Sequence, residues 1–409
     1  MKIILSHPTG NANVRAAAVG MKEAGLLNEF HTSIAVFPDD PLFKLSRLRG
    51  PFSEMGRRVF DPSLKDLTYS SPLWEIGRLI SSKVGFSSLI EHEKGLFCVD
   101  SVYRRVDKIV AKTLIKKNNG FSAVYAYEDG ALHSFDIAKH LGLSCYYDLP
   151  IGYWRTARNL MKSELEKWPE WAGTLTGFKD SDEKLSNKDK ELKLADRIFV
   201  ASTFTAKTLQ DYPGNLAKVD IIPYGFPTVG ESRKYGHHKS LKVLFVGGLS
   251  QRKGIAYLFE AADYLGAAVE LTIVGQRPVE DCQPLNASLS KHKWIPSLSH
   301  GDILKIMREQ DVLVFPSLFE GFGLVITEAM SQGTPVITTD RTAGPDLIEN
   351  GENGWIIEAG STDALIKALE ELLYNPGKIV SVGKGAMETA IKRPWHVYGR
   401  ELSECIINY

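Results

Sequence analysis

The chain has 409 residues, of which 44% are hydrophobic and 24% are charged, and its formal net charge at pH 7 is zero. This length predicts at least two domains, and the composition is typical of a soluble globular protein, which excludes disordered and membrane-embedded classes. The balanced charge gives no indication of a nucleic-acid partner.

Neither the hydrophobic pattern nor the cysteines indicate a membrane anchor or a metal centre. No apolar run reaches the roughly 18 residues that span a bilayer, and the N-terminal residues become polar too early for a secretory signal. The four cysteines are scattered, without the close pairs typical of zinc or redox sites. We therefore expect a cytoplasmic protein with reduced, structural cysteines.

The first expected unit is a strand at 2–6, a loop, and a helix at about 14–24. Asn13 is in place to cap the start of this helix, and Gly25 is in place to stop it. Such a unit leaves free N–H groups at the carboxyl edge of a sheet, where anionic ligands bind.

Residues 39–118 are the hardest part of the sequence to interpret. Prolines interrupt this stretch, and arginines and lysines alternate with Leu, Phe, Trp and Tyr. Because no segment shows a clean amphipathic period, we favour short helices whose arginines face water. The alternative is a surface that lies on an anionic membrane or holds a phosphate-bearing acceptor.

Two further strands are expected at 123–127 and 143–150, with a helix at 131–140 between them. Tyr153 and Arg155 follow the second of these strands, on the side of the expected cleft. An aromatic ring beside an arginine suits either a sugar face with a phosphate or a packed corner, and both interpretations stay open.

The lysine- and glutamate-rich run at 179–193 predicts a solvated helix. It contains Asp180-Ser181-Asp182, which has the letters of a metal-binding motif, but the polar surroundings predict no metal there. A strand at 195–202, a helix at 203–209 and a strand from residue 219 complete the first half. The polar run that follows is typical of a linker.

The second half is expected to begin with a strand at 242–246, a glycine-rich loop and a helix at 255–265. Arg252 and Lys253 lie in this loop, directly before the helix. Two adjacent cations at a helix start suit a diphosphate. The alternative is a pair of solvated cations in a turn.

The stretch 311–333 carries the strongest functional pattern. It predicts a buried strand at 312–315, a glycine-rich loop at 319–323 and a helix at 324–332. Ligands bind at the carboxyl ends of such strands, and the glycines allow backbone to approach a phosphate closely. Glu320 and Glu328 flank this loop, with Glu328 about 6 Å along the helix axis.

Further strands and helices are expected on both sides of this stretch. They are a strand at 270–274, a helix at 302–310, strands at 335–339 and 355–357, a helix after 361, and a last helix near 395–407.

The stretch around Glu320 resembles the retaining glycosyltransferases of family 4, which have the GT-B fold. The family pattern has two glutamates separated by seven residues, within a frame of fixed small and apolar positions, and this frame is far more specific than the glutamates alone. The chain matches it at Pro316, Ser317, Glu320, Gly321, Phe322, Gly323, Leu324, Glu328, Ala329, Met330 and Gly333.

The resemblance implies an α/β protein with two Rossmann-like domains that face each other across a cleft. The expected division is an N-terminal acceptor-binding domain at 1–228, a linker at 229–240 and a C-terminal donor-binding domain at 241–389. The segment 390–409 is expected to pack back on the first domain.

The resemblance also implies the roles of individual residues. Arg252, Lys253 and Glu320 are expected to be catalytic. The donor site is expected to consist of Gly10, Gly248, Arg252, Lys253, Leu298, Glu320, Gly321, Phe322, Gly323, Leu324 and Glu328. Acceptor contacts are expected from Asn11, Arg15, Tyr127, Glu128, Tyr153 and Arg155.

Two departures from the family pattern are visible in the sequence. The family often has a histidine at the end of the strand 123–127, where this chain has Tyr127 and Glu128. The usual arginine of the diphosphate loop is replaced by Gly248, so Arg252 is expected to take its role from the other side of the loop. In place of the missing histidine, carboxylates such as Glu128 can bind the sugar hydroxyls.

The expected function is transfer of a sugar from a nucleotide-diphosphate donor to a hydroxyl acceptor, without a metal or other cofactor. The setting implied by the family is cell-surface polysaccharide, lipopolysaccharide or glycolipid synthesis, with a saccharide or lipid-linked acceptor. The residues of 39–118 leave open a peripheral contact with the inner face of the membrane. The alternatives are a nucleotide-sugar 2-epimerase-like enzyme and a non-catalytic GT-B subunit that binds a partner transferase.

Overall fold

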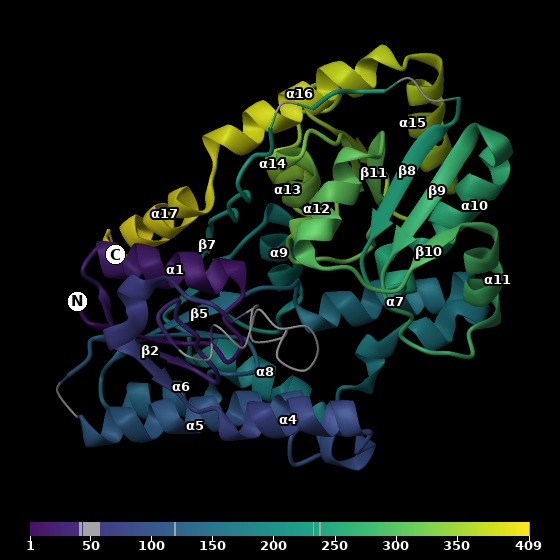
Figure 1. Cartoon of the computed structure of the whole chain (residues 1–409). Helices are drawn as coiled ribbons and strands as arrows, with labels where there is room; N and C mark the ends of the chain where they lie inside the picture. Colours follow the sequence, from purple (N-terminus) through teal and green to yellow (C-terminus); the bar gives the residue numbers. More distant parts are fainter. Residues whose placement is uncertain (41–42, 44–57, 118–119, 232, 237–238, 409) are drawn as a thin grey trace.

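The computed structural model describes residues 1–40, 43, 58–117, 120–231, 233–236 and 239–408. The chain forms two α/β domains, each built on a parallel sheet, with a long helical segment along one side of both (Figure 1). Among the described residues, we find no helix that combines the length and the apolar character needed to cross a membrane.

The sheet of the first domain has seven parallel strands in the order β3-β2-β1-β4-β5-β6-β7. Their bounds are β1 Ile3–Ser6, β2 Leu27–Thr32, β3 Thr68–Ser70, β4 Ala123–Tyr127, β5 Ser144–Leu149, β6 Arg197–Val200 and β7 Lys218–Ile221. The order reverses between β1 and β4, and a reversal of this kind opens a crevice at the carboxyl ends of the strands.

The sheet of the second domain has six parallel strands in the order β10-β9-β8-β11-β12-β13. Their bounds are β8 Leu241–Val246, β9 Val269–Val274, β10 Lys293–Ile295, β11 Val312–Phe315, β12 Val336–Thr339 and β13 Trp355–Ile357. Every residue of β11 is buried, as expected for a continuous apolar run covered on both faces of a parallel sheet. The order of this sheet reverses between β8 and β11, which places the loops after these strands at a second crevice.

Helices cover both sheets. In the first domain they are α1 Ala12–Glu23, α4 Leu73–Val84, α5 Val99–Lys116, α6 Leu132–His140, α7 Trp154–Lys167, α8 Asp182–Leu194 and α9 Thr203–Thr208. In the second domain and the C-terminal segment they are α10 Ile255–Leu265, α11 Gln283–Lys291, α12 His300–Arg308, α13 Leu324–Ser331, α14 Gly344–Leu347, α15 Thr362–Tyr374, α16 Gly377–Lys392 and α17 Trp395–Ile407. Short 3-10 helices include η2 Ser87–Ile90, η3 Pro169–Thr174, η4 Thr176–Lys179 and η6 Gln251–Lys253.

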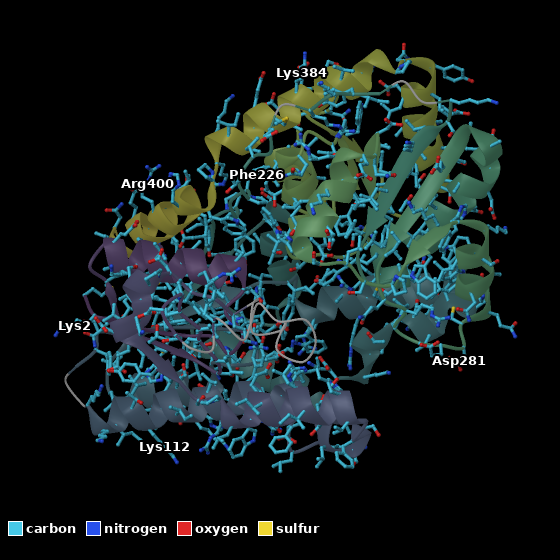
Figure 2. All side chains as sticks on the ribbon, in the orientation of Figure 1. Lys2, Lys112, Phe226, Asp281, Lys384 and Arg400 are labelled. Carbon is cyan, nitrogen blue, oxygen red and sulfur yellow. The ribbon has the colours of Figure 1, made fainter. Side chains whose placement is uncertain are left out.

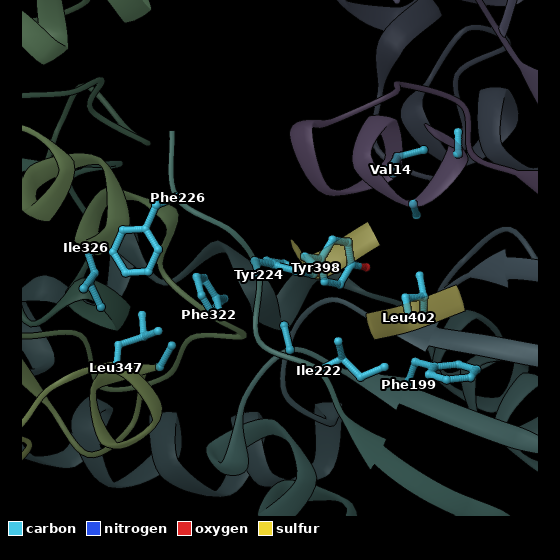
Figure 3. Close-up of a cluster of buried hydrophobic side chains, with 14 of the residues drawn as sticks. Val14, Phe199, Ile222, Tyr224, Phe226, Phe322, Ile326, Leu347, Tyr398 and Leu402 are labelled. Carbon is cyan, nitrogen blue, oxygen red and sulfur yellow. The ribbon is translucent and has the colours of Figure 1, made fainter. Parts of the chain in front are cut away.

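The C-terminal helix returns to the first domain, as the sequence predicts. α17 packs along α1 (Figure 1), and the two helices come closest where Gly20 faces Gly399, since a side-chain carbon on Gly20 would lie 2.3 Å from the Gly399 carbonyl oxygen. Tyr224, just after the first sheet, packs its ring on Phe322 of the second domain and on Tyr398 of α17 (Figure 3). One apolar core therefore runs through the contact between the domains.

Two segments complicate the predicted division of the chain. The 3-10 helix after α7 packs on the second domain, where Trp171 stacks on Phe259. The linker also packs there, since Arg233 and Tyr235 both donate to the carbonyl oxygen of Gly333. The boundaries at 229–240 stay our proposal, and the sequence pattern gives no signal for the docking of the segment after α7.

Two local expectations are wrong, and one strand was not predicted. Asn13 lies inside α1 and donates to the hydroxyl of Tyr224, while Asn11 occupies the cap position. The helix α8 is not simply solvated, because Lys188 and Glu191 are buried on it and bind the loop after β4. The strand β2 lies in a stretch where we predicted no element, because three of the five residues that it buries are polar, which leaves no apolar run or alternation to detect.

Candidate functional site

The two crevices meet in one cleft between the domains. A cavity of about 410 Å³ lies there, at the carboxyl ends of β1, β8 and β11. Its lining comes from both domains and comprises His7, Asn11, Asn13, Tyr103, Pro150, Tyr224, Val246, Gly247, Lys253, Phe315, Glu320, Phe322, Gly323, Leu324 and Val325. Both loops of the second domain that the sequence indicated, those of Lys253 and Glu320, therefore line this cavity.

Glu320 is the centre of the charged groups in the cleft. One of its carboxylate oxygens forms an ion pair with Lys253, and the other lies 3.1 Å from Nη1 of Arg252. Arg252 also donates to the carbonyl oxygen of Phe319 over 2.7 Å. The structure thus brings together the three residues expected to be catalytic, with two cations against one carboxylate.

This cluster has an excess positive charge in a poorly solvated place. Burial lowers the pKa of the Arg252 guanidinium to about 10. Burial, and then the charge of Arg252, lower the pKa of the Lys253 ammonium well below its ordinary value. An anion bound beside these groups would offset both costs, so the cluster is an anion-binding arrangement.

Backbone geometry holds the two loops in the shape that this cluster requires. Gly254, at the end of the Arg252–Lys253 turn, has φ +69°, and a side-chain carbon there would lie 2.1 Å from the carbonyl oxygen of Pro316. Gly323 has φ +87° and precedes α13 directly. Since L-residues rarely adopt such φ values, glycine allows the loop to turn into the helix and leaves the first N–H groups of α13 facing the cleft.

Glu328 lies on α13, at the other end of the loop from Glu320. Burial raises the pKa of its carboxyl, and His300 opposes this shift with Nδ1 at 3.5 Å from Oε1. His300 opens α12, and we did not predict it as a site residue. Its signal in the sequence was its position at a helix start close to the Leu298 loop.

His7 is a second residue that we missed. It follows β1, is buried and lines the cleft. Its Nδ1 accepts from the N–H groups of Thr9 and Gly10, at 3.1 and 3.2 Å, which places the ring proton on Nε2. Burial lowers the pKa of His7 to about 3, so the ring is neutral at physiological pH.

The residues predicted from the loop after β1, namely Gly10, Asn11 and Arg15, do not all face the cleft. Gly10 has φ +60° and lies under the ring of Phe60, where a side-chain carbon would be 2.2 Å from the ring. Asn11 lines the cleft cavity. Arg15 points away from it and donates to the carbonyl oxygen of Val59, beside a separate groove. The structure therefore brings Asn11, but not Arg15, to the cleft.

Tyr127 and Glu128, at the end of β4, do not lie together in the cleft. Tyr127 is buried, and its ring packs edge-on against His7 at 4.7 Å. Glu128 forms an ion pair with Lys188 over 3.1 Å. Burial raises the pKa of Glu128 to about 7, against the opposing charge of Lys188.

Glu128 instead lines a second cavity of about 220 Å³, which the Arg252 side chain also borders. This cavity lies under α7 and carries the aromatic side chains Trp154, Phe178 and Phe319. It adjoins the anion-binding cluster, because Arg252 and Phe319 line it while their chain neighbours Lys253 and Glu320 line the cleft cavity.

Tyr153 and Arg155 form a packed corner, the second of the two interpretations left open by the sequence. Tyr153 is fully buried, and its hydroxyl donates to Asp189. Arg155 also binds Asp189, at 2.6 Å, and lies over the ring of Trp154. These two side chains thus hold α7 to α8 and do not line either cavity.

Six predicted donor residues do not line the cleft cavity, namely Gly10, Gly248, Arg252, Leu298, Gly321 and Glu328. Gly248 is exposed beside Gly247, which does line it. Leu298 packs against the hydrophobic core with its side chain half-buried. Their expected roles stay predictions.

The Asp180-Ser181-Asp182 run begins a helix. The Ser181 hydroxyl accepts from the N–H of Lys184 and caps α8. Asp180 lies 2.8 Å from Nε2 of His92, and ligand atoms of His92, Glu93 and Asp180 lie within 4.8 Å of one another. Lys184 also lies 3.2 Å from Asp180, so an ammonium already neutralises this carboxylate.

Residues 231–389 match the family model of glycosyl transferases group 1. The amylovoran biosynthesis glycosyltransferase AmsK of Erwinia amylovora is 27% identical over 187 residues, which cover 41% of this chain and 45% of that protein. A phosphatidyl-myo-inositol mannosyltransferase of Mycobacterium leprae is 32% identical over 157 residues, covering 37% of this chain and 39% of the mannosyltransferase. The chain thus spans less than half the length of these two relatives.

Solved structures resemble the chain over its whole length. The sucrose-phosphate synthase from Thermosynechococcus elongatus has a TM-score of 0.66 at 16% identity, covering 100% of this chain and 98% of the synthase. Anabaena HepE in complex with UDP has a TM-score of 0.64 at 15% identity, covering 100% of both chains. At these identities the likeness shows the GT-B fold, with its two Rossmann-like domains.

Proposed function

We propose that this chain, a GT-B protein of the glycosyl transferases group 1 family, transfers a sugar from a nucleotide-diphosphate donor to a hydroxyl acceptor, with retention of the anomeric configuration. The observation that carries the proposal is the half-buried cluster of Arg252 and Lys253 around Glu320, at the glycine loop of the interdomain cleft. The departing diphosphate is the species that such a cluster binds best.

Each part of the cluster has a distinct task in this proposal. Arg252 and Lys253 stabilise the negative charge that grows on the diphosphate as the bond to the sugar breaks. The first N–H groups of α13 bind the same phosphates. Glu320 accepts hydrogen bonds from the donor-sugar hydroxyls and exchanges its present cation contacts for them when the diphosphate arrives.

The reaction then needs no nucleophilic side chain. In the front-face mechanism proposed for such enzymes, a phosphate oxygen of the donor accepts the proton of the acceptor hydroxyl. The acceptor oxygen bonds to the anomeric carbon on the face that the diphosphate leaves. Because Arg252 and Lys253 supply two positive charges, we propose that transfer proceeds without a metal ion and continues in the presence of a chelator.

The acceptor is proposed to be a saccharide or a lipid-linked sugar of a surface polysaccharide or glycolipid. The named functions of relatives, such as the capsular polysaccharide biosynthesis glycosyltransferase CapM of Staphylococcus aureus, support this class. We place the reaction in the cytoplasm, at the inner face of the membrane. Asn11 is the predicted acceptor residue that lines the cleft.

A thermal-shift panel tests the donor site directly. UDP-, GDP-, ADP- and CDP-sugars are compared without added metal, in the unaltered chain and in Glu328→Ala. Binding at a hundredfold excess over Kd stabilises the folded state by about 2.7 kcal/mol, so we expect a clear rise in Tm with one base. We expect Glu328→Ala to weaken this rise, because Glu328 is proposed to bind the ribose hydroxyls.

The same panel distinguishes the other two functions. No shift with any donor, in a folded protein, would contradict the transferase proposal and favour a non-catalytic subunit. Donor turnover that needs no acceptor and returns an epimer would favour the 2-epimerase-like alternative.

His7 gives a further prediction for the first-domain wall. We propose that its Nε2–H donates to the donor phosphates or a sugar hydroxyl, since Nδ1 is occupied by the loop. His7→Phe should lower kcat/KM by about 10- to 100-fold, the effect of losing a hydrogen bond of about 1.5–3 kcal/mol to a charged group. Steady-state kinetics with the identified donor measure this.

The pH profile supplies the control for His7. Because burial lowers the pKa of His7 to about 3, no ionisation of this ring should appear in kcat/KM between about pH 5 and 8. If the profile of kcat/KM showed a histidine ionisation near neutrality, and this ionisation disappeared in His7→Phe, the proposal that His7 donates a hydrogen bond as a neutral ring would be contradicted.

A further inference from the structure

The helix α4 buries polar residues and exposes apolar ones, the reverse of a usual amphipathic helix. The residues that it buries are Glu75 and Ser81. Leu73, Ile80 and Val84 are exposed to 72%, 56% and 59%, and Ile76 also faces outward. These four apolar residues recur at spacings of three and four, so they form one stripe along the outer face of the helix.

Ion pairs hold α4 in this orientation. Glu75 binds Arg58, which is itself buried, and Nε of Arg78 at 2.8 Å. A buried carboxylate without a cation would be costly, so these contacts fix which face of α4 points inward. The apolar stripe is therefore a stable surface feature of the fold.

The exposed apolar surface continues beyond the end of α4. Phe86 follows the helix and is 60% exposed, and Leu96 and Val99, beside the start of α5, are exposed to 56% and 53%. Exposed apolar side chains on elements that pack together, as α4 does with η2 and α5, are typical of an interaction surface.

The neighbouring helix α5 presents cations to solvent. Its exposed charged residues are Arg104, Arg105, Lys108, Lys112 and Lys116. Their spacing places them on one face of the helix. The two carboxylates of α5 lie elsewhere, because Asp107 is buried under the start of α6 and Asp100 binds Lys184. Among the described residues, this face of α5 therefore carries charge of one sign.

The two surfaces meet at the start of α4. Arg105 lies over the ring of Trp74, with its guanidinium carbon 4.5 Å from the ring centroid. Figure 1 shows α4 and α5 along one edge of the first domain, on the side away from α17. Lys112 points outward from this edge in Figure 2, away from the body of the protein.

We propose that the apolar stripe of α4 and the cationic face of α5 together dock this protein on an anionic lipid bilayer. Apolar side chains enter the boundary between headgroups and acyl chains, while arginines and lysines pair with the phosphates around them. The combination favours a bilayer over another protein, because the cationic face contains no exposed carboxylate among its described residues and complements a continuous negative surface.

This docking would also place the bilayer close to the cleft. Tyr103, which lines the cleft cavity, lies on the face of α5 opposite to its cations, so the helix α5 lies between the cleft and the docked surface. If the acceptor is lipid-linked, as the proposed function allows, its sugar would have to reach the cleft past this helix. The docking itself does not depend on glycosyl transfer.

Vesicle flotation tests the proposal. One set of vesicles contains phosphatidylcholine alone, and the other contains phosphatidylcholine and phosphatidylglycerol in a three-to-one ratio. We expect the full chain to float with the anionic vesicles, to be displaced by salt, and to float weakly with the neutral ones. The double variant Lys108→Gln/Lys112→Gln and the variant Ile80→Ser should each weaken binding by about tenfold.

Matched controls come from α16, at the opposite side of the molecule. Lys384→Gln/Lys392→Gln removes two exposed lysines, and Ile391→Ser removes an isoleucine that is 63% exposed. Figure 2 shows Lys384 on this far side. Both control variants should float like the unaltered chain.

Three outcomes would overturn the proposal: no flotation with anionic vesicles, equal flotation by α4, α5 and α16 variants, or a dimer that depends on Ile80 without vesicle binding. The last would assign the stripe to a second copy of the chain. Nucleotide-sugar thermal shifts on the same samples report the donor site separately, and we expect the α4 and α5 variants to leave these shifts unchanged.

Discussion

Replacing Lys253 by glutamine should lower kcat for sugar transfer by about 100- to 1,000-fold. A hydrogen-bonding group that is held in place and aimed at the negative charge of the transition state lowers the activation free energy by about 2.7–4 kcal/mol in comparable sites. The Lys253 side chain is 13% exposed, lies beside Glu320 and faces the cleft, so a bound donor leaves little room for water to replace its charge. Single-turnover kinetics with saturating donor measure the effect on the chemical step.

The pH dependence of donor affinity should change in the same variant. In the empty site, burial and Arg252 lower the pKa of Lys253, while a bound diphosphate favours the charged form and raises it. Affinity is then full below the lowered pKa of the free protein and falls as the pH rises above it, because binding has to take up a proton. Lys253→Gln should lose this slope.

Lys384→Gln is the matched control for this experiment. Lys384 is exposed on α16, outside the cleft. The variant Lys384→Gln should keep the kcat of the unaltered chain and the same dependence of donor affinity on pH. Unchanged turnover in Lys253→Gln would remove the diphosphate role from this lysine and leave Arg252 as the remaining cation.

The sequence predicted the second domain well because its functional loops are local. The strand β11 and the helix α10 lie at the predicted residues, and the glycine loop joins β11 to α13 as expected. Each signal comes from residues that are neighbours along the chain, namely an apolar run, a glycine turn and a helix start. The position of Glu320 between two cations then follows from two such loops that meet at one sheet edge.

The first domain was harder because its important contacts are distant in sequence. Glu75 and Arg58 fix α4 with its apolar face outward, which a search for an amphipathic helix with a buried apolar face cannot detect. Asp189 decides that Tyr153 and Arg155 form a packed corner. Lone residues of this kind have no local pattern, so only the folded chain shows what they bind.

His7 illustrates a different limit of the sequence. The loop pattern predicted a ligand-binding turn, and Gly10 was assigned to it. The tautomer of His7 depends on two backbone N–H groups within this turn, and its low pKa depends on burial by the rest of the domain. Sequence alone gave the place of the site in this case, whereas the protonation state needed the structure.

Replacing Gly321 by alanine should abolish most of the transfer activity while the protein stays folded. A side-chain carbon on Gly321 would lie 1.9 Å from the carbonyl oxygen of Pro150 and 2.7 Å from Cα of Ile151, both in the first domain. The neighbouring contact is also between domains, since the hydroxyls of Ser202 and Thr205 donate to the carbonyl oxygen of Gly321, at 2.5 and 2.9 Å.

The expected loss follows from this tight approach. Backbone atoms cannot yield as a flexible side chain can, so the domains must separate at the loop that carries Glu320. A displacement of about 1 Å between catalytic groups and substrate can lower a rate by about 100-fold. The cost in stability should be smaller, about 1 kcal/mol for each weakened hydrogen bond. Transfer kinetics and thermal unfolding of Gly321→Ala measure the two effects.

Gly377→Ala tests whether the effect belongs to the contact between the domains. Gly377 begins α16, and no atom lies within 4 Å of the place that its side-chain carbon would occupy. This variant should keep full activity. Full activity in Gly321→Ala would mean that the reaction does not need the present approach of the two domains, and that Glu320 reaches the donor from a more open cleft. Loss of activity with an unchanged donor-induced shift in Tm would instead locate the defect in the closing of the first domain onto a donor that is already bound.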